Sequence, residues 1–200
     1  MTNMSTVKNL DKLLGKLDAV GLQAPPIMEK GVKKGIKLIQ GSAKHLCSVN
    51  DGALQNSIKT RTKIKENIVT GDVYTNNDHA AYVEFGTGPK GEVSEKQVPP
   101  GFTLIYTHGK PMQSAKGNTF AQGGWWIHVG DDKGDISRAD VEKYHFFTRT
   151  SADGETFAFT SGQPAQPYLY PALVANEDKV MDIISDTVRR EIIKAVKKDG

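Results

Sequence analysis

The chain has 200 residues, of which 26 are Lys or Arg and 23 are Asp or Glu, so its formal net charge is only +3. A general binder of polyanions is usually far more basic, and 24% charged residues is close to the average of globular proteins, which argues against wholesale disorder. The single cysteine excludes an internal disulfide and a zinc site built from several cysteines. Because there is no apolar run of about 18 residues and no apolar signal core in residues 1–10, we expect an intracellular protein without a membrane-spanning helix.

The small net charge hides a gradient along the chain. Residues 1–70 carry 12 basic and 5 acidic side chains, residues 71–170 carry 8 and 12, and residues 171–200 carry 6 and 6. The first segment is thus +7, the second −4 and the third neutral. Such a chain can attract copies of itself, or it can expose one basic face to nucleic acid. A gradient without any function is the remaining alternative.

Two amphipathic helices are predicted in the first quarter of the chain. The first has apolar residues three or four positions apart: Val7, Leu10, Leu13, Leu14 and Leu17. After the Pro25–Pro26 pair, which suits a first helical turn, a second apolar stripe runs to about residue 48, opposite a row of lysines. Gly31 and Gly35 lie four residues apart in this second helix, a spacing that permits the close approach of another backbone.

The hydrophobic period then changes to two, which predicts β-strands. Ile58–Lys65 is the first strand, Ile68–Thr75 returns beside it, and Ala80–Phe85 is the third strand of an antiparallel meander. The first strand places its cations in one row: Lys59, Arg61, Lys63 and Lys65. We assign this row to contact with another subunit or partner. A phosphate-facing row and a purely solubilising surface are the alternatives.

Residues 86–165 are rich in Gly, Pro, Ser and Asp, which predicts a long loop that carries β-hairpins. Strands are expected at 125–129, 144–149 and 155–160, with the Asp-Gly turn at 152–154 joining the last two. Loops of this length in compact domains are usually functional. Since no catalytic set appears in it, we expect this loop to serve contact, with Trp125 and Trp126 as its candidate contact residues.

A long helix from about Tyr170 to Lys197 completes the chain, and its expected buried stripe begins at Leu173 and continues through Ile192. The elements together predict an α+β fold: a small antiparallel sheet packed by N-terminal helices and a long C-terminal helix, with a β-hairpin-rich insertion loop. We expect a single domain over residues 1–200, with a core at 22–89 and 160–198 and an insertion arm at 90–160.

No motif for catalysis or ligand binding is complete in the sequence. Gly86–Gly91 matches the G-x-G-x-x-G phosphate pattern, but that pattern needs a helix directly afterward, and Pro89 and the Pro99–Pro100 pair argue against one. The segment from Asp131 to Glu142 resembles a calcium loop, yet it has lysine at its third position and isoleucine at its sixth. The five histidines are scattered, without an H-E-x-x-H motif. We therefore predict no catalytic residues, no cofactor and no metal.

Two segments carry a more specific resemblance: Ala80–Pro89, with the sequence AAYVEFGTGP, and Gly162–Leu173, with the sequence GQPAQPYLYPAL. Together they resemble the tail-component, or tail-completion, family of long-tailed bacteriophages and prophages. In that family a Tyr-Val-Glu-Phe-Gly-Thr motif ends a strand, and a Pro-aromatic-Leu-x-Pro-Ala motif opens the C-terminal helix. The matching residues here are Tyr82, Glu84, Phe85, Gly86 and Thr87 in the first motif and Pro167, Tyr168, Leu169 and Pro171 in the second.

The resemblance implies a structural virion protein of the neck or tail end, which joins or completes the tail at the head–tail interface and is no enzyme. It implies a place in the virion after assembly in the host cytoplasm. The implied partners are copies of the chain in a ring (six-fold, or alternatively twelve-fold), other neck and tail proteins, and DNA that passes through the lumen without specific binding. No membrane partner is expected. A DNA-binding module that uses the face around Lys59–Lys65 is the alternative function, and a small enzyme with a site near Trp125, Trp126, His128 and His145 is a third hypothesis.

Overall fold

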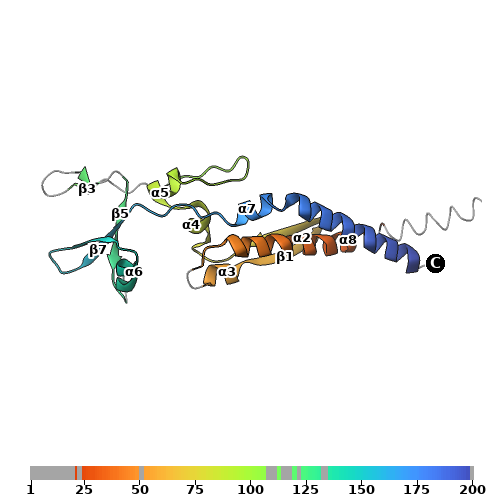
Figure 1. Cartoon of the computed structure of the whole chain (residues 1–200), viewed down its shortest axis with the longest axis horizontal. Helices are drawn as coiled ribbons and strands as arrows, with labels where there is room; N and C mark the ends of the chain where they lie inside the picture. Colours follow the sequence, from red (N-terminus) through yellow and green to blue (C-terminus); the bar gives the residue numbers. More distant parts are fainter. Residues whose placement is uncertain are drawn as a thin grey trace, which may run out of the picture. The chain divides into compact units, whose positions relative to one another are not determined.

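The computed structural model describes residues 21, 24–49, 52–106, 112–113, 119–120, 123–131 and 135–198. The chain divides into two compact units (Figure 1): unit 1 belongs to residues 1–77 and 168–200, and unit 2 to residues 78–167. Both units contain helices, and the sheets are small and antiparallel, so the predicted α+β class is confirmed. The helix predicted over residues 7–17 lies outside the described residues.

Helix α2, Ala24–Leu46, is the second predicted helix, and its apolar side is buried as the spacing predicts. The core residues on this side are Ile27, Val32, Ile36, Ile39 and Ala43. A Cβ atom on Gly31 would lie 3.2 Å from the Cα of Ile184, and one on Gly35 would lie 2.8 Å from Cγ1 of Val180. The predicted close approach at the two glycines is therefore confirmed, and the partner is helix α8, Glu177–Lys198.

A β-hairpin follows the short helix α3, Ala53–Ser57. Strands β1, Lys59–Lys65, and β2, Ile68–Tyr74, pair in antiparallel register. The two turn residues, Glu66 and Asn67, have positive φ angles of 50° and 67°, as a type I′ turn requires. The two predicted strands are confirmed, but they form a two-stranded hairpin instead of part of a three-stranded meander.

One face of the hairpin packs on α2. A Cβ atom on Gly71 would lie 2.5 Å from Cγ1 of Val32 and 2.7 Å from Cγ2 of Ile36, so only glycine allows this approach. On the neighbouring strand the Thr62 hydroxyl donates to Oε1 of Glu29 at 2.6 Å. Because side chains alternate along a strand, the β1 cations lie on the opposite face, where all four are exposed.

The prediction of a single C-terminal helix from Tyr170 to Lys197 is wrong. The chain instead forms α7, Leu169–Val174, and then the separate helix α8. The break falls at Asn176, whose buried side chain donates from Nδ2 to the carbonyl of Ala172 at 2.8 Å, while its own carbonyl accepts from Val180 N at 2.9 Å. An asparagine amide competes for backbone hydrogen bonds in this way and so ends one helix and starts the next. Leu173, which was expected in the buried stripe, is 45% exposed.

In unit 2, the prediction of a third strand is also wrong, because Ala80–Phe85 is helix α4. Its helical hydrogen bonds include Val83 N to His79 O at 3.0 Å and Gly86 N to Tyr82 O at 2.9 Å. Periodicity alone does not distinguish a strand from a helical turn in so short an apolar run, and the alanines at its start favour a helix. Helix α5, Gly88–Val93, follows, with Pro89 in its first turn, so Pro89 starts a short helix and does not prevent one.

The remainder of unit 2 is mainly β-structure. Strands β5, Trp125–Val129, β6, Phe147–Thr150, and β7, Thr156–Thr160, form a three-stranded antiparallel sheet in the order β5-β7-β6. All three strands were predicted, and the turn glycine between β6 and β7 has the expected positive φ, 86°. Helix α6, Arg138–Lys143, and the two-residue strands β3, Met112–Gln113, and β4, Thr119–Phe120, were not predicted.

Candidate assembly site

The first motif lies on α4 and on the turn that ends it. Gly86 ends the helix with a φ of 73°, and a Cβ atom there would lie 2.7 Å from Ala165 N, Gln163 O and Gly91 Cα. A positive φ and this lack of space together require glycine. The motif therefore places a sharp bend against residues 163–165, which are distant in sequence.

Hydrogen bonds hold these two segments side by side. Thr87 N donates to Gln163 O at 2.9 Å, and Gln163 N donates back to the Thr87 hydroxyl at 3.1 Å. The Gln163 side chain donates from Nε2 to the carbonyl of Tyr82 at 2.8 Å, and Gln166 N donates to Val83 O at 2.7 Å. The first motif is thus joined to the segment that leads into the second motif.

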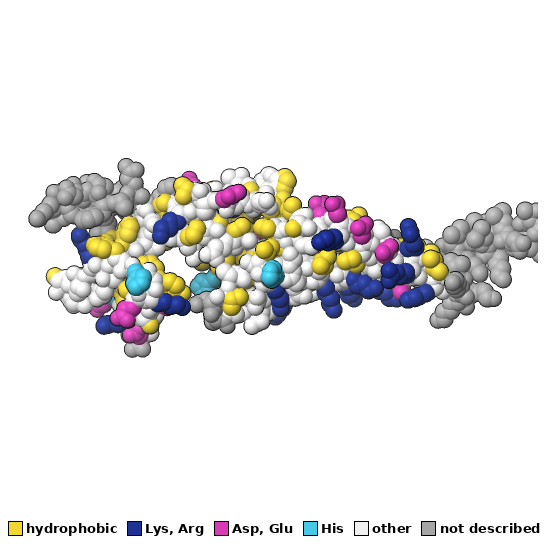
Figure 2. All heavy atoms as spheres, viewed as in Figure 1, with side chains coloured by type: hydrophobic (Ala, Val, Ile, Leu, Met, Phe, Trp, Pro, Cys, Tyr) yellow, Lys and Arg dark blue, Asp and Glu magenta, His cyan; other side chains and the backbone are white. Residues whose placement is uncertain are grey.

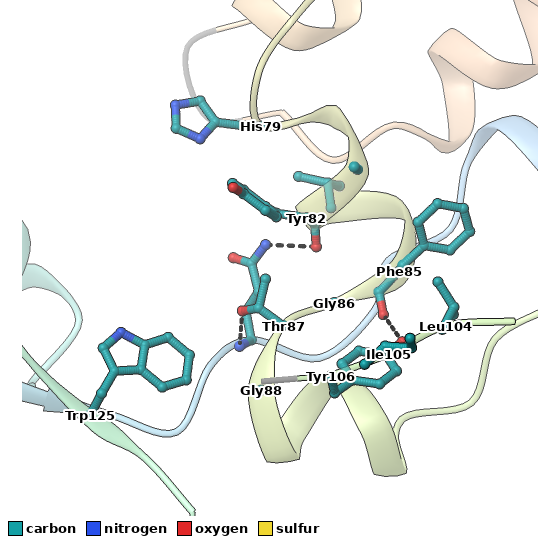
Figure 3. Close-up of a pocket in the computed structure, with 13 residues that line it drawn as sticks. His79, Tyr82, Phe85, Gly86, Thr87, Gly88, Leu104, Ile105, Tyr106 and Trp125 are labelled. Carbon is teal, nitrogen blue, oxygen red and sulfur yellow. Dashed lines mark hydrogen bonds between the residues drawn. The ribbon is translucent and has the colours of Figure 1, made fainter. Parts of the chain in front are cut away.

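Beside this junction lies a pocket of about 660 Å³, shown in Figure 3. Its walls are contributed by α4, by the Gly86–Gly88 bend, by residues 104–106 and by Trp125. The Tyr106 hydroxyl donates to the carbonyl of Phe85 at 2.7 Å, which fixes one wall to the end of α4. Ile105 on the same wall is 93% exposed. The pocket is mostly apolar and aromatic, and His79, Tyr82, Thr87, Tyr106 and Gln163 are among the lining residues that carry polar groups.

The motif residues occupy different places around this pocket. Tyr82, Phe85, Gly86 and Thr87 line it, whereas Glu84 is not a lining residue and is buried, with only 3% of its surface exposed. The lining residues Leu104, Ile105 and Tyr106 were not predicted as site residues, because they lie in a Pro- and Gly-rich stretch without periodicity. Gln163 was part of the second quoted segment but was not singled out.

The second motif lies at the start of α7, as expected for a segment that opens a helix. Tyr168 is the residue before the first helical turn and is fully buried, and Pro171 lies within the helix. Pro167 is the last residue of unit 2, and the other three motif residues belong to unit 1.

The two tryptophans lie on opposite faces of β5. Trp125 lines the pocket, whereas Trp126 packs against Phe147 and Phe159, with ring centroids 5.9 and 5.4 Å away. Neighbouring residues of a strand point to opposite sides, so they cannot contribute to one surface. Trp125 is the one that faces the pocket.

The β1 cations are partly paired within the hairpin. The Arg61 guanidinium donates from Nε to Oδ2 of Asp72 at 2.6 Å and lies 4.9 Å from the ring centroid of Tyr74. The hydrogen bond to Asp72 raises the pKa of Arg61 further, so this side chain stays charged. Nζ of Lys65 lies 3.7 Å from Oε1 of Glu66, in an exposed ion pair. For Lys59 and Lys63, no ion pair is present within the described part of the chain.

The described residues contain no group of three His, Cys, Asp or Glu side chains that could hold a metal ion. Of the two histidines in the enzyme hypothesis, His128 pairs with Glu155 at 2.6 Å, an exposed pair at the end of a sheet. No described helix is both long and apolar enough to cross a bilayer.

The comparisons with known proteins bear on the N-terminal part of the chain. Residues 11–86 match the family model described as "Bacteriophage HK97-gp10, putative tail-component". No curated protein and no solved structure matches the chain. The matched segment covers α2, the hairpin and α4, and it ends within the first motif, at Gly86. Over residues 11–86 the chain is therefore similar to the HK97-gp10-like family of phage tail components, the kind of family that its two motifs resemble.

Proposed function

We propose that the protein is a structural component of the phage neck or tail end that forms a homo-oligomeric ring and joins or completes the tail at the head–tail interface. The observation that carries this proposal is the tail-component match over residues 11–86, together with the motif that ends it. A tail component acts in the virion and contacts other tail or neck proteins. The protein has no catalytic role in this proposal.

The residues of the candidate site have two roles in this proposal. Gly86, Thr87 and Gln163 build the bend and the junction, because packing and hydrogen bonds account for them without a partner. Trp125, by contrast, lines a pocket whose outer wall includes the exposed Ile105. We assign contact in the assembly to this pocket side of unit 2, and contact with a subunit or partner to the β1 cation row.

The experiment is native mass spectrometry and negative-stain imaging of the full chain, alone and with the neighbouring neck proteins of the same phage. The expected result is a ring of defined stoichiometry, either from the chain alone or once the neck proteins are added. A six-fold and a twelve-fold ring are distinguished directly by mass. A chain that remains monomeric and joins no ring or tail end under either condition overturns the proposal.

A further inference from the structure

Helix α8 carries an acidic stripe on the side that faces away from α2. Val180 and Ile184 lie against the glycines of α2, which defines the packed side. Asp178, Asp182 and Asp186 are offset from them by two positions, about 200° around the helix, and recur every four residues. All three are exposed, and their stripe is about 12 Å long.

Within the described residues, one ion pair reaches this stripe. Asp186 lies 3.8 Å from Arg190 in a largely exposed pair, which contributes little stability. Within the described part of the chain, no ion pair reaches Asp178 or Asp182. In Figure 2, acidic side chains gather along the edge where α8 lies in Figure 1, and basic side chains gather along the opposite edge of this unit.

Helix α2 carries the matching basic stripe. Lys30 and Lys33 already pair within the unit, with Glu191 at 2.6 Å and Glu29 at 2.9 Å. The other lysines of this helix, Lys34, Lys37 and Lys44, have no ion pair within the described residues. Lys34 and Lys37 are exposed and Lys44 is partly exposed, and the three span about 15 Å along the helix axis.

We propose that the Asp178–Asp182–Asp186 stripe of one copy docks on the Lys34–Lys37–Lys44 stripe of α2 in a second copy. The two stripes are opposite in charge, similar in length and held on the same unit, so each copy offers both halves of the contact. A contact between two different faces is head-to-tail, the arrangement that generates rings when its rotation closes. The aliphatic stems of the lysines would also cover Met181, which lies beside the stripe and is 58% exposed.

This inference rests on the proposed ring and specifies which faces meet in it. It places the acidic partner of the α2 lysines on α8, in the same unit as the lysines. A nucleic-acid partner would match the lysines but would leave the acidic stripe without a role. A second copy accounts for both stripes.

The test uses charge reversal in the full chain, followed by sedimentation velocity. The acid-reversed variant is Asp178→Lys with Asp182→Lys, and the base-reversed variant is Lys34→Glu with Lys37→Glu. Each should self-associate at least about tenfold more weakly than wild type, since like charges then face each other. A mixture of the two should associate again, because each then offers the charge that the other lacks. Asp153→Lys, at the exposed β6–β7 turn, is the matched control and should change nothing.

Three outcomes separate this inference from the proposed function. A wild-type ring that both reversed variants form equally well overturns the inference alone. A wild-type chain that stays monomeric even with the neck proteins overturns the proposed function and the inference together. Asp178 lies in the first turn of α8, where a lysine opposes the helix dipole and could weaken the helix itself. The second acid-reversed variant therefore carries only Asp182→Lys, and circular dichroism verifies its helix content. If that folded variant keeps full association, the inference is also wrong.

Discussion

At the scale of single residues, glycines decide which segments can approach each other. In α2, a Cβ atom added to Gly35 would meet Val180, whereas one added to Gly41 of the same helix would have no atom within 4 Å. Both are helical, so alanine at either position gains about 1 kcal/mol of helix propensity. Only at Gly35 does the added methyl group meet a packed neighbour.

Gly35→Ala should therefore destabilise unit 1, because overpacking costs about 1–3 kcal/mol and offsets the gain in propensity. Gly41→Ala should stabilise it by about 0.5–1 kcal/mol. Urea unfolding followed by far-ultraviolet circular dichroism measures both changes. Stabilisation by both substitutions would show that α8 is not held against α2 at this point.

A second pair of glycines tests the junction in unit 2. Gly162 and Gly154 have nearly the same φ, 85° and 86°. A Cβ atom on Gly162 would lie 1.9 Å from the carbonyl oxygen of Thr87, whereas around Gly154 there is open space. Gly154→Ala should lower the free energy of unfolding only by the strain of placing alanine in a left-handed backbone conformation, about 1–2 kcal/mol.

Gly162→Ala should cost clearly more than that, because Thr87 must also move away from Gln163. The free energy of unfolding, followed by tryptophan fluorescence, checks this. Equal losses at the two positions would contradict the close junction between the first motif and residues 162–166.

At the scale of elements, an ion pair links the start of α2 to the second half of α8. Glu191 accepts from Nζ of Lys30 at 2.6 Å and of Lys194 at 3.0 Å. The hydrogen bond from Lys30, followed by that from Lys194, lowers the pKa of Glu191 from 4.5 to about 2. A lowered pKa means that folding favours the ionised carboxylate, so the contribution is fully present above pH 4.5 and is lost as the pH falls toward 2.

Glu191→Gln should therefore remove part of the acid sensitivity of unit 1. The loss of stability between pH 4.5 and pH 2 should be smaller in the variant than in wild type, although other carboxylates also titrate there. Thermal unfolding at several pH values across that range, with circular dichroism as the signal, makes the comparison. An identical pH dependence in the two proteins would show that the α2–α8 pair does not form in solution.

The β1 hairpin favours a protein contact over a DNA contact. Arg61 and Lys65 already face carboxylates of the same hairpin, and Tyr74 is occupied by the Arg61 guanidinium, so no open aromatic platform accompanies the row within the described hairpin. We expect no retention of duplex DNA at low salt in a gel-shift assay. Retention that weakens steeply with salt, by a log–log slope of about −0.9 per phosphate contacted, and that Lys59→Ala with Lys63→Ala abolishes, would instead support the DNA-binding alternative.

At the scale of the whole molecule, the two units carry different spectroscopic signals. Both tryptophans, Trp125 and Trp126, belong to unit 2, whereas the two long helices, α2 and α8, belong to unit 1. Tryptophan fluorescence thus reports on unit 2, and helical circular dichroism reports mainly on unit 1. Each unit has buried residues of its own, including Ala43 in unit 1 and Ala158 in unit 2.

We therefore expect the two signals to give separable unfolding transitions, as in multidomain proteins. Gly35→Ala should shift the unfolding midpoint measured by circular dichroism and leave the midpoint measured by tryptophan fluorescence nearly unchanged. Gly162→Ala should shift the fluorescence midpoint and leave the dichroism midpoint nearly unchanged. Coincident midpoints in wild type and in both variants would mean that the chain unfolds as one cooperative unit.

Elements that depend on local patterns were predictable from the sequence. The apolar spacing of α2 and the alternation in β1 act over a few neighbours, and both appear as expected. Strands β5, β6 and β7 of unit 2 were predictable for the same reason. The family resemblance likewise needed only contiguous motif residues, and it is confirmed over residues 11–86.

The sequence by itself thus determined the α+β class, the helix–hairpin order of unit 1 and the resemblance of its first part to a phage tail-component family. Tertiary structure added the contact of Gln166 with Val83 to the helix Ala80–Phe85 and decided which lysines of α2 stayed unpaired among the described residues. The break at Asn176 follows from a local hydrogen bond to Ala172, which apolar periodicity does not detect. The two tertiary effects depend on partners distant in sequence: Gln166 donates to the carbonyl of Val83, and Glu191 accepts from Lys30. Periodicity extends over one turn or one strand, whereas hydrogen bonds and ion pairs join residues that only the folded chain brings together.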